Sequence, residues 1–333
     1  MNNPVKHSFM SVIDDSKHVK IDKIALSAYV DSLGDKAFSL PDWKLPVFLE
    51  GDDDKTIDYF FLGNAINFAF NDFETGVKYK FHYKDTDWMG AFGMWAALKA
   101  AVEDRRLSLD GDCIRVNGKP LSQIEPSDLD GILQKDSKIP MFNERVEILR
   151  EIGKGLELFY GGHASNLISA GRELFGPSGV ITRITADFPS FKDISRYGGN
   201  DIVFNKRAQL AIVMIYERFL ADGQKLFSDR DMNEITVFAD YELPKILHAL
   251  GILTYDSDLE NRIQSGMLIE RDSEEEVELR ANTIYAVELL KTMINAKRAP
   301  DKAVNALNID YLLWSEGRKM KDKKAHMTKT TNY

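Results

Sequence analysis

The sequence predicts a mainly α-helical protein, with a single helical domain over residues 1–318 and small β-hairpin excursions. Three observations lead to this prediction. From about residue 140 onward, apolar residues recur at steps of three or four. Strict alternation of apolar and polar residues is confined to short stretches, and we find no internal repeat and no long linker. Hydrophobic residues make up 44% of the 333 residues, which is enough for a sizeable core.

The first half of the chain mixes helices with turns and short strands. Residues 21–33 (IDKIALSAYVDSL) and 93–105 (GMWAALKAAVEDR) are the two clearest helices. Residues 77–83 (VKYKFHY) alternate strictly, which predicts a short strand. Residues 107–121 carry Asp-Gly and Asn-Gly between short apolar runs and predict a β-hairpin, and residues 126–133 start a short helix.

The second half is mostly helical. Residues 141–159 show the helical period most clearly. Further apolar-periodic stretches cover residues 163–175, 206–221, 243–250 and 281–295. The last stretch, residues 319–333, is basic, polar and free of periodicity, so we expect a disordered tail.

Net charge limits the class of partner. The formal net charge is −9, whereas proteins that bind a duplex or a tRNA usually carry a basic footprint. We therefore expect no large nucleic acid as a partner. A small phosphorylated ligand is compatible with this charge, because it needs only a local pair of cations.

The cysteine content and the N-terminus indicate the compartment. Cys113 is the single cysteine, so an intramolecular disulfide and a cysteine-based zinc site are excluded. Lys6, Asp14 and Asp15 fall where a signal peptide needs an apolar stretch. No run approaches the roughly 20 apolar residues of a membrane helix. We expect a cytoplasmic protein with no membrane partner.

Asp240 lies in an unusual place for an acid. It follows the apolar run 237–239 and precedes the helix predicted over 243–250. One interpretation is a helix cap, which is the common role of an aspartate before a helix. The other is a functional carboxylate, desolvated by apolar neighbours and held by a cation, that serves as acid, base or nucleophile.

Lys206 and Arg207 open another predicted helix, directly after Asn205, which suits an N-cap. Cations are unfavourable at this end of a helix, where the dipole is positive. Together with the exposed backbone N–H groups they form an anion site, for a phosphate, for a carboxylate of this protein, or for both. The alternative is a surface pair without a partner.

Two apolar stretches carry further candidates. Residues 64–73 (NAINFAFNDF) place Phe68, Phe70 and Phe73 beside Asn67, either as core or as a stacking site for a flat heterocycle. Asp310 lies inside the apolar stretch 308–314 and needs a partner there. That partner is either a buried arginine or the donor edge of a purine-like base.

Common catalytic motifs are absent. The sequence has no Walker loop, dinucleotide fingerprint, H-E-x-x-H or G-x-S-x-G motif. Its six histidines are scattered without the spacing of metal ligands. We therefore expect neither a metal nor a cofactor.

A set of stretches, in order along most of the chain, resembles the queuosine-salvage protein family, the queuosine 5′-phosphate N-glycosylases. These stretches are INFAF (66–70), IPMFNERVEILREIG (139–153), DFPSFKD (187–193), FNKRAQ (204–209), FADYELPKILHALGIL (238–253) and NIDYLLW (308–314). The resemblance implies a core similar to that of helix-hairpin-helix DNA glycosylases. It also implies release of queuine from queuosine 5′-phosphate, for salvage of the modified tRNA base.

The resemblance assigns roles to individual residues. Asp240 corresponds to the catalytic carboxylate and Lys206 to a lysine beside it. The residues expected around the substrate are Asn67, Phe68, Phe70, Tyr241 and Asp310, with Arg207 or Lys206 at the 5′-phosphate. The chain departs from the family at Asn71, where an aromatic residue often follows the NFxF pattern, and one wall of the base pocket is affected.

Two other kinds of protein fit the same stretches. One is a non-catalytic protein that captures queuine or a related nucleoside. The other is a glycosylase that acts on a different nucleoside or on DNA, although the negative net charge argues against DNA.

Overall fold

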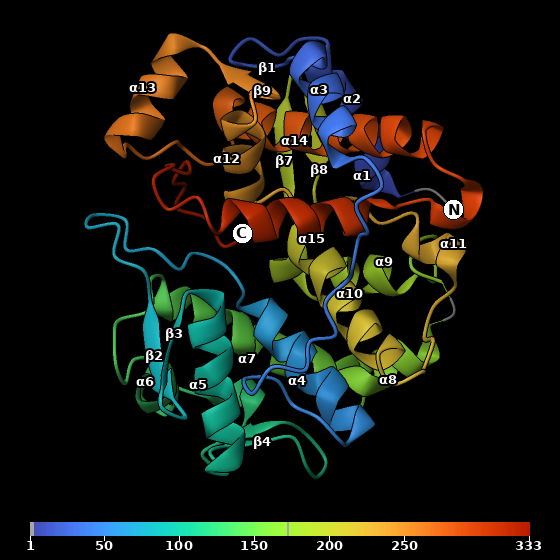
Figure 1. The fold of residues 1–333 in the computed structure, drawn as a ribbon. Coiled ribbons are helices and arrows are strands. Elements are labelled where there is room, and N and C mark those ends of the chain that lie inside the picture. Colours follow the sequence, from blue (N-terminus) through green and yellow to red (C-terminus); the bar gives the residue numbers. More distant parts are fainter. Residues whose placement is uncertain (1–2, 172) are drawn as a thin grey trace.

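The computed structural model describes residues 3–171 and 173–333, and these form a mainly helical protein with four small antiparallel sheets (Figure 1). The α-helices are α1 (Pro4–Ser8), α2 (Met10–Ile13), α3 (Lys23–Leu33), α4 (Asp53–Ala65), α5 (Ala91–Glu103), α6 (Pro126–Leu133), α7 (Phe142–Phe159), α8 (Ala164–Ala170), α9 (Val180–Asp187), α10 (Lys206–Leu220), α11 (Asp229–Met232), α12 (Glu242–Ala249), α13 (Ser257–Ser265), α14 (Glu274–Ala296) and α15 (Ala306–Gly317). The strands are β1 (Val19–Ile21), β2 (Lys80–Tyr83), β3 (Thr86–Met89), β4 (Leu107–Ser108), β5 (Arg115–Val116), β6 (Lys119–Pro120), β7 (Ile194–Tyr197), β8 (Asn200–Val203) and β9 (Leu253–Tyr255). The prediction of a mainly α protein is confirmed.

Most predicted elements are present with small changes of boundary. The helix predicted over 93–105 is α5, and the helix predicted over 141–159 is α7. The hairpin predicted over 107–121 is the three-stranded sheet β4–β5–β6. The strand predicted over 77–83 is shorter, because only β2 pairs with β3, and Val77 is 65% exposed.

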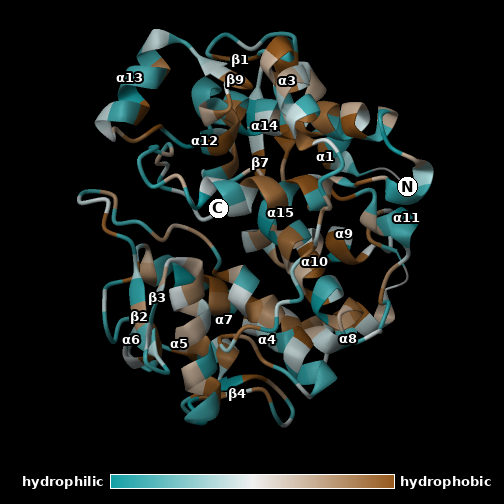
Figure 2. Ribbon diagram, in the orientation of Figure 1, coloured by the Kyte–Doolittle hydropathy of each residue, from teal (hydrophilic) through white to brown (hydrophobic). Residues whose placement is uncertain are grey.

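Buried apolar side chains form two clusters. The first gathers around α4, α5, α7 and α10, and the second around α3, α12, α14 and α15. α10 packs against α4, and α15 packs against α12 and α14. Apolar ribbon lies on α10 and α15 in the middle of the molecule, while the peripheral α13 is largely polar (Figure 2). Leu307 of α15 belongs to the first cluster, whereas Ile309 and Leu313 of the same helix belong to the second, so the two clusters adjoin at α15.

Helix α10 is buried on nearly all sides, and this places its polar residues in the interior. Apolar periodicity predicts a helix over 206–221, and its periodic residues Ala208, Ile212, Ile215 and Phe219 are buried. The opposite side is buried as well, so that even Glu217 is only 4% exposed. A helix covered on all sides brings its polar residues into the interior, where they need partners.

The expectation of a disordered tail over 319–333 is wrong for its last residues. His326, Thr330 and Tyr333 are each at most 3% exposed, and Ile269 N donates to Met327 O at 2.8 Å. The backbone N–H of Ala69 donates to the Tyr333 carbonyl at 3.1 Å. Polar contacts hold this segment inside the protein, and such contacts leave no apolar period in the sequence.

None of the helices in residues 3–171 and 173–333 combines the length and the apolar character needed to cross a membrane.

Candidate active site

An open cavity lies between the two clusters, bounded by the stretch after α4, by α5 and α10, by the start of α12 and by α15. It contains about 1090 Å³ of space free of atoms, a volume that includes the open solvent at its mouth. Six of the eight predicted site residues line it, namely Asn67, Phe70, Lys206, Asp240, Tyr241 and Asp310. Phe68 and Arg207 are not part of the lining that the structure describes.

Asp240 is both a helix cap and a cavity residue. Its Oδ1 accepts the backbone N–H groups of Glu242 at 2.8 Å and of Leu243 at 3.3 Å, in the first turn of α12. The two interpretations of the sequence are therefore compatible. The helix terminus fixes the orientation of the carboxylate, and the same side chain lines the cavity.

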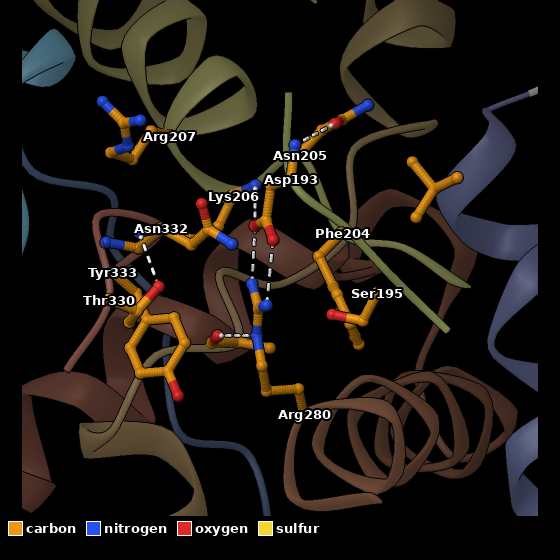
Figure 3. A network of polar contacts seen from close by, with 12 residues as sticks. Asp193, Ser195, Phe204, Asn205, Lys206, Arg207, Arg280, Thr330, Asn332 and Tyr333 are labelled. Atoms are coloured by element: carbon orange, nitrogen blue, oxygen red, sulfur yellow. Dashed lines mark hydrogen bonds and ion pairs between the residues drawn. The ribbon is translucent and has the colours of Figure 1, made fainter. Parts of the chain in front are cut away.

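Lys206 opens α10 in a tightly held backbone. Asn205 adopts the left-handed conformation (φ 46°) and makes no side-chain cap, and instead its Oδ1 accepts from Asp193 N at 3.2 Å. The carboxylate of Asp193 serves as the cap, because its Oδ2 accepts from Lys206 N at 3.2 Å (Figure 3). The anion at this helix N-terminus is thus a carboxylate of the protein itself, one of the alternatives left by the sequence.

Lys206 and Asp240 influence each other's charge. Burial lowers the pKa of the Lys206 ammonium, while the negative charges of Asp240 and Asp310 raise it in part. Burial raises the pKa of the Asp240 carboxyl, and the positive charge of Lys206 opposes that rise. Each group thus helps the other to remain ionised in a poorly solvated place.

Two further acids occupy the cavity with strongly raised pKa values. Burial raises the pKa of Asp310 to about 8, even though its Oδ2 accepts from Phe238 N at 2.8 Å. Burial likewise raises the pKa of Glu217 to about 8, against the hydrogen bond that Trp43 Nε1 donates to its Oε2 at 2.8 Å. At neutral pH both groups are therefore mainly protonated and able to donate a hydrogen bond.

Aromatic side chains form much of the cavity wall. Trp314 lies 6.1 Å from Phe92 and 6.1 Å from Tyr311 between ring centroids, and all three line the cavity together with Trp43 and Phe70. Aromatic faces on several sides suit a flat, partly apolar ring. Asn71, the departure from the family pattern, pairs with Lys78 in an isolated bridge, just beyond the cavity-lining Phe70.

Phe68 lies in the core and outside the described cavity lining, so contact of its ring with the substrate remains a prediction. It is fully buried, and the guanidinium of Arg145 lies 4.1 Å from its ring centroid. Arg145 also donates to the carbonyls of Ile66 at 2.8 Å and Ala69 at 2.8 Å. The side chains of Phe68 and Arg145 point into the core. Since Arg145 bonds the backbone on both sides of Asn67 and Phe68, it fixes the segment that places Asn67 and Phe70 at the cavity.

Arg207, predicted at a phosphate, is likewise a core residue. It is 2% exposed and donates to the carbonyls of Ala65 and Ser190. Its guanidinium lies 5.3 Å from the Phe68 ring centroid and 5.2 Å from that of Phe191. Successive residues of a helix point in different directions, so Lys206 faces the cavity and Arg207 faces the core. A phosphate role for Arg207 remains a prediction that its position does not favour.

Sequence analysis missed several cavity residues. Lys78 and Arg318 line the cavity as cations, and Arg318 stacks on Trp314 at 4.8 Å. Burial lowers the pKa of Lys78, partly against the pull of Glu242. Tyr333 also lines the cavity. Lys78 lies in the alternating stretch 77–83, and Arg318 follows the end of α15. Basic residues are common at both kinds of position, so the sequence does not mark either residue as part of a binding site.

The chain is similar to known proteins along most of its length. A family model described as queuosine salvage protein matches residues 48–333. The queuosine 5′-phosphate N-glycosylase/hydrolase of Sphaerobacter thermophilus is 31% identical over 310 residues, which cover 93% of this chain and 90% of that protein. Proteins of the same name are similar as well. The protein of Schizosaccharomyces pombe is 31% identical, covering 90% of this chain and 87% of its own length, and that of Mus musculus is 27% identical, covering 98% of both.

Proposed function

This chain belongs to the queuosine salvage protein family, and we propose that it hydrolyses the N-glycosidic bond of queuosine 5′-phosphate and releases queuine. In this proposal Asp240 is the catalytic carboxylate and Lys206 assists it. The observation that supports it most is the presence of both side chains in one aromatic-walled cavity, together with two neutral acids.

The chemistry follows from the transition state of N-glycoside cleavage. As the bond to the base breaks, positive charge develops at C1′ and the ring oxygen, as for other glycosides. Oδ1 of Asp240 is held by two backbone N–H groups, which leaves Oδ2 for the substrate. The carboxylate stabilises the positive charge, and it either takes a proton from the attacking water or attacks C1′ directly. Lys206 keeps Asp240 ionised for this role.

Asp310 and Glu217 are two acids of the cavity that can donate a hydrogen bond to the departing base. Queuine lacks the purine N7 that other hydrolases protonate, so its negative charge on leaving must be stabilised elsewhere on the ring. A carboxyl that is protonated at neutral pH donates a hydrogen bond to such a ring edge. We assign this role to Asp310. In its ionised form, the Asp310 carboxylate can instead pair with the cationic aminomethyl arm of queuine.

Lys78 and Arg318 replace Arg207 as the residues that we assign to the 5′-phosphate. Both line the cavity, and the positive charge of Arg318 is close enough to help lower the pKa of Lys78. Their mutual repulsion is relieved when an anion binds between them. Lys78→Ala should raise KM for queuosine 5′-phosphate about tenfold and leave KM for the nucleoside queuosine within about twofold, because only the nucleotide carries the phosphate. Equal changes for the two substrates would refute the phosphate role.

The test of the proposed function is incubation with queuosine 5′-phosphate and detection of queuine by mass spectrometry. Asp240→Asn should keep binding and lose turnover by about three orders of magnitude or more, because the amide is neutral. Asp22→Asn is the matched control: Asp22 Oδ1 also accepts two backbone N–H groups, at 2.8 and 3.0 Å, at the start of α3, away from the cavity. Binding of queuine without release from substrate in the unmodified protein would indicate a binding protein instead.

Three further proposals concern the core, the domain and the compartment. We propose that the helices around the cavity form a core like that of helix-hairpin-helix DNA glycosylases, which superposition on solved glycosylases tests. We also propose that residues 1–318 act as one domain, against which the C-terminal segment packs, and limited proteolysis tests this. We propose that the protein works in the cytoplasm, which fractionation tests.

A further inference from the structure

Lys206 and Asp240 are 34 residues apart in sequence and belong to different helices, so something must hold these two helix starts in register. Arg280 of α14 bonds the backbone carbonyl just before Asp240 and the Asp193 carboxylate that accepts from the backbone of Lys206. Arg280 is fully buried, and it does not belong to the cavity lining among the described residues. Its contacts therefore act through other residues.

On the Lys206 side, Arg280 holds the cap of α10. Its Nη1 and Nη2 donate to the two oxygens of Asp193 at 2.9 and 2.6 Å (Figure 3). Asp193 Oδ2 in turn accepts from Lys206 N. A bidentate pair fixes the plane of the carboxylate, and that plane fixes the first turn of α10.

On the Asp240 side, the same guanidinium holds the preceding residue. Arg280 Nε donates to the carbonyl of Ala239 at 3.1 Å. One planar group thus bonds the segments that carry the ammonium and the carboxylate. Its plane is further restrained by the Phe204 ring, 3.8 Å away, and by the Tyr333 ring, 4.7 Å away.

We propose that Arg280 is a positioning residue that sets the distance and orientation between Lys206 and Asp240. This inference rests on the proposed function, since it concerns the geometry of that reaction. Only arginine presents three N–H directions in one plane, so lysine at this position retains the charge and loses the bridge. Small displacements of catalytic groups cost large factors in rate.

Arg280→Lys tests the proposal by its effect on rate and on pH dependence. We expect kcat to fall about tenfold or more, with KM within about twofold, because substrate contacts stay in place. The acid limb of the kcat profile should also move to higher pH. Lys206 lowers the pKa of Asp240, so a displaced Lys206 lets that pKa rise.

The direction of the expected pKa shift of Asp240 depends on the charged groups around Asp240 and around Arg280. Asp240 interacts with Lys206 of α10, with Glu242 of α12, with Asp310 of α15 and with Lys78 before β2. Arg280 faces Asp193, Glu276, His326, Tyr333 and Lys206. Lys206 belongs to both sets: its charge acts on Asp240, and Arg280 holds its backbone through Asp193.

Two controls keep the outcome decisive. Arg262→Lys alters another arginine, whose Nη1 lies 2.8 Å from Glu275 away from the cavity, and should leave kcat and the acid limb unchanged. Asp193→Asn perturbs the same bridge from its other end and replaces Arg280→Lys if that variant does not fold, as judged by its thermal midpoint.

The proposal is overturned if a folded Arg280→Lys, or Asp193→Asn in its place, has the kcat and acid limb of the unmodified protein. It is equally overturned if kcat falls while the acid limb stays in place, since that indicates a role in the fold alone. The unmodified protein and Asp240→Asn are measured alongside. An active Asp240→Asn would reject the proposed function, whereas its inactivity together with an unaffected Arg280→Lys rejects only the bridge.

Discussion

Replacing Asp310 by asparagine should make the protein more stable and less active. Asp310 is 8% exposed, and burial raises its pKa from the ordinary 3.8 to about 8. In Asp310→Asn, the amide oxygen keeps the acceptor that Phe238 N needs, and the amide NH₂ fills the space of the carboxyl hydrogen but is a much weaker acid. The substitution therefore removes the cost of a buried titrating acid with little change of shape.

The sign and size follow from the two protonation states. Below pH 3.8 the acid is protonated in both folded and unfolded chains, so it costs nothing. Between pH 3.8 and about 8 the unfolded chain releases a proton that the folded protein keeps, so the stability of the wild-type protein declines. At about 1.4 kcal/mol per pKa unit, the decline is at most about 6 kcal/mol. Relaxation of neighbouring groups reduces this, and we expect about 1–3 kcal/mol.

Urea unfolding of both proteins at about pH 4, 6 and 8.5 measures this effect. The advantage of Asp310→Asn in free energy of unfolding should be near zero at the lowest pH and largest at the highest. Asp22→Asn, at an exposed cap, should show no comparable widening. Release of queuine by Asp310→Asn should fall about tenfold or more, because the base loses its acid. Parallel stability curves would refute the buried neutral acid, and unchanged affinity and turnover would refute its role at the base.

Two further substitutions distinguish a residue that lines the cavity, Lys206, from one that stabilises the fold, Arg207. Lys206→Ala should fold and lose most activity, because Asp240 then loses the cation that lowers its pKa most and is more readily protonated. Queuine release across neutral pH checks this, and near-normal turnover would contradict it. Arg207→Ala should cost about 2–5 kcal/mol, measured by urea unfolding, because it orphans two buried carbonyls and opens a void, while KM in the folded fraction stays unchanged.

Residues at helix starts were accessible to sequence reasoning. Asp240 and Lys206 both stand where an apolar run gives way to a helix, and the chemistry of helix N-termini draws attention to such positions. Asp193, the anion at the start of α10, gives no such signal, because its contact with Lys206 joins residues on either side of the β7–β8 hairpin. Long-range pairings of this kind leave no local pattern.

Glu217 and the tail show a second limit. Glu217 lies mid-helix between Tyr216 and Arg218, where an acid usually faces solvent, and it becomes internal only because α10 is covered on both sides. Tyr333 belongs to a stretch whose composition suggests disorder, yet its hydroxyl donates to Glu276 at 2.9 Å in the interior. Polar burial depends on partners elsewhere in the chain, which hydrophobic periodicity does not record.

The charge of the cavity resolves an apparent conflict with the charge of the whole protein. A net charge of −9 disfavours long polyanions, whose binding scales with the number of phosphates neutralised on an open surface. A single phosphate responds instead to nearby charges, and Lys78, Lys206 and Arg318 all line one cavity. Because its walls are largely apolar, solvent screens these cations less than surface lysines. A net charge of −9 is therefore compatible with the proposed binding of a single nucleotide, and it does not favour binding of a whole tRNA.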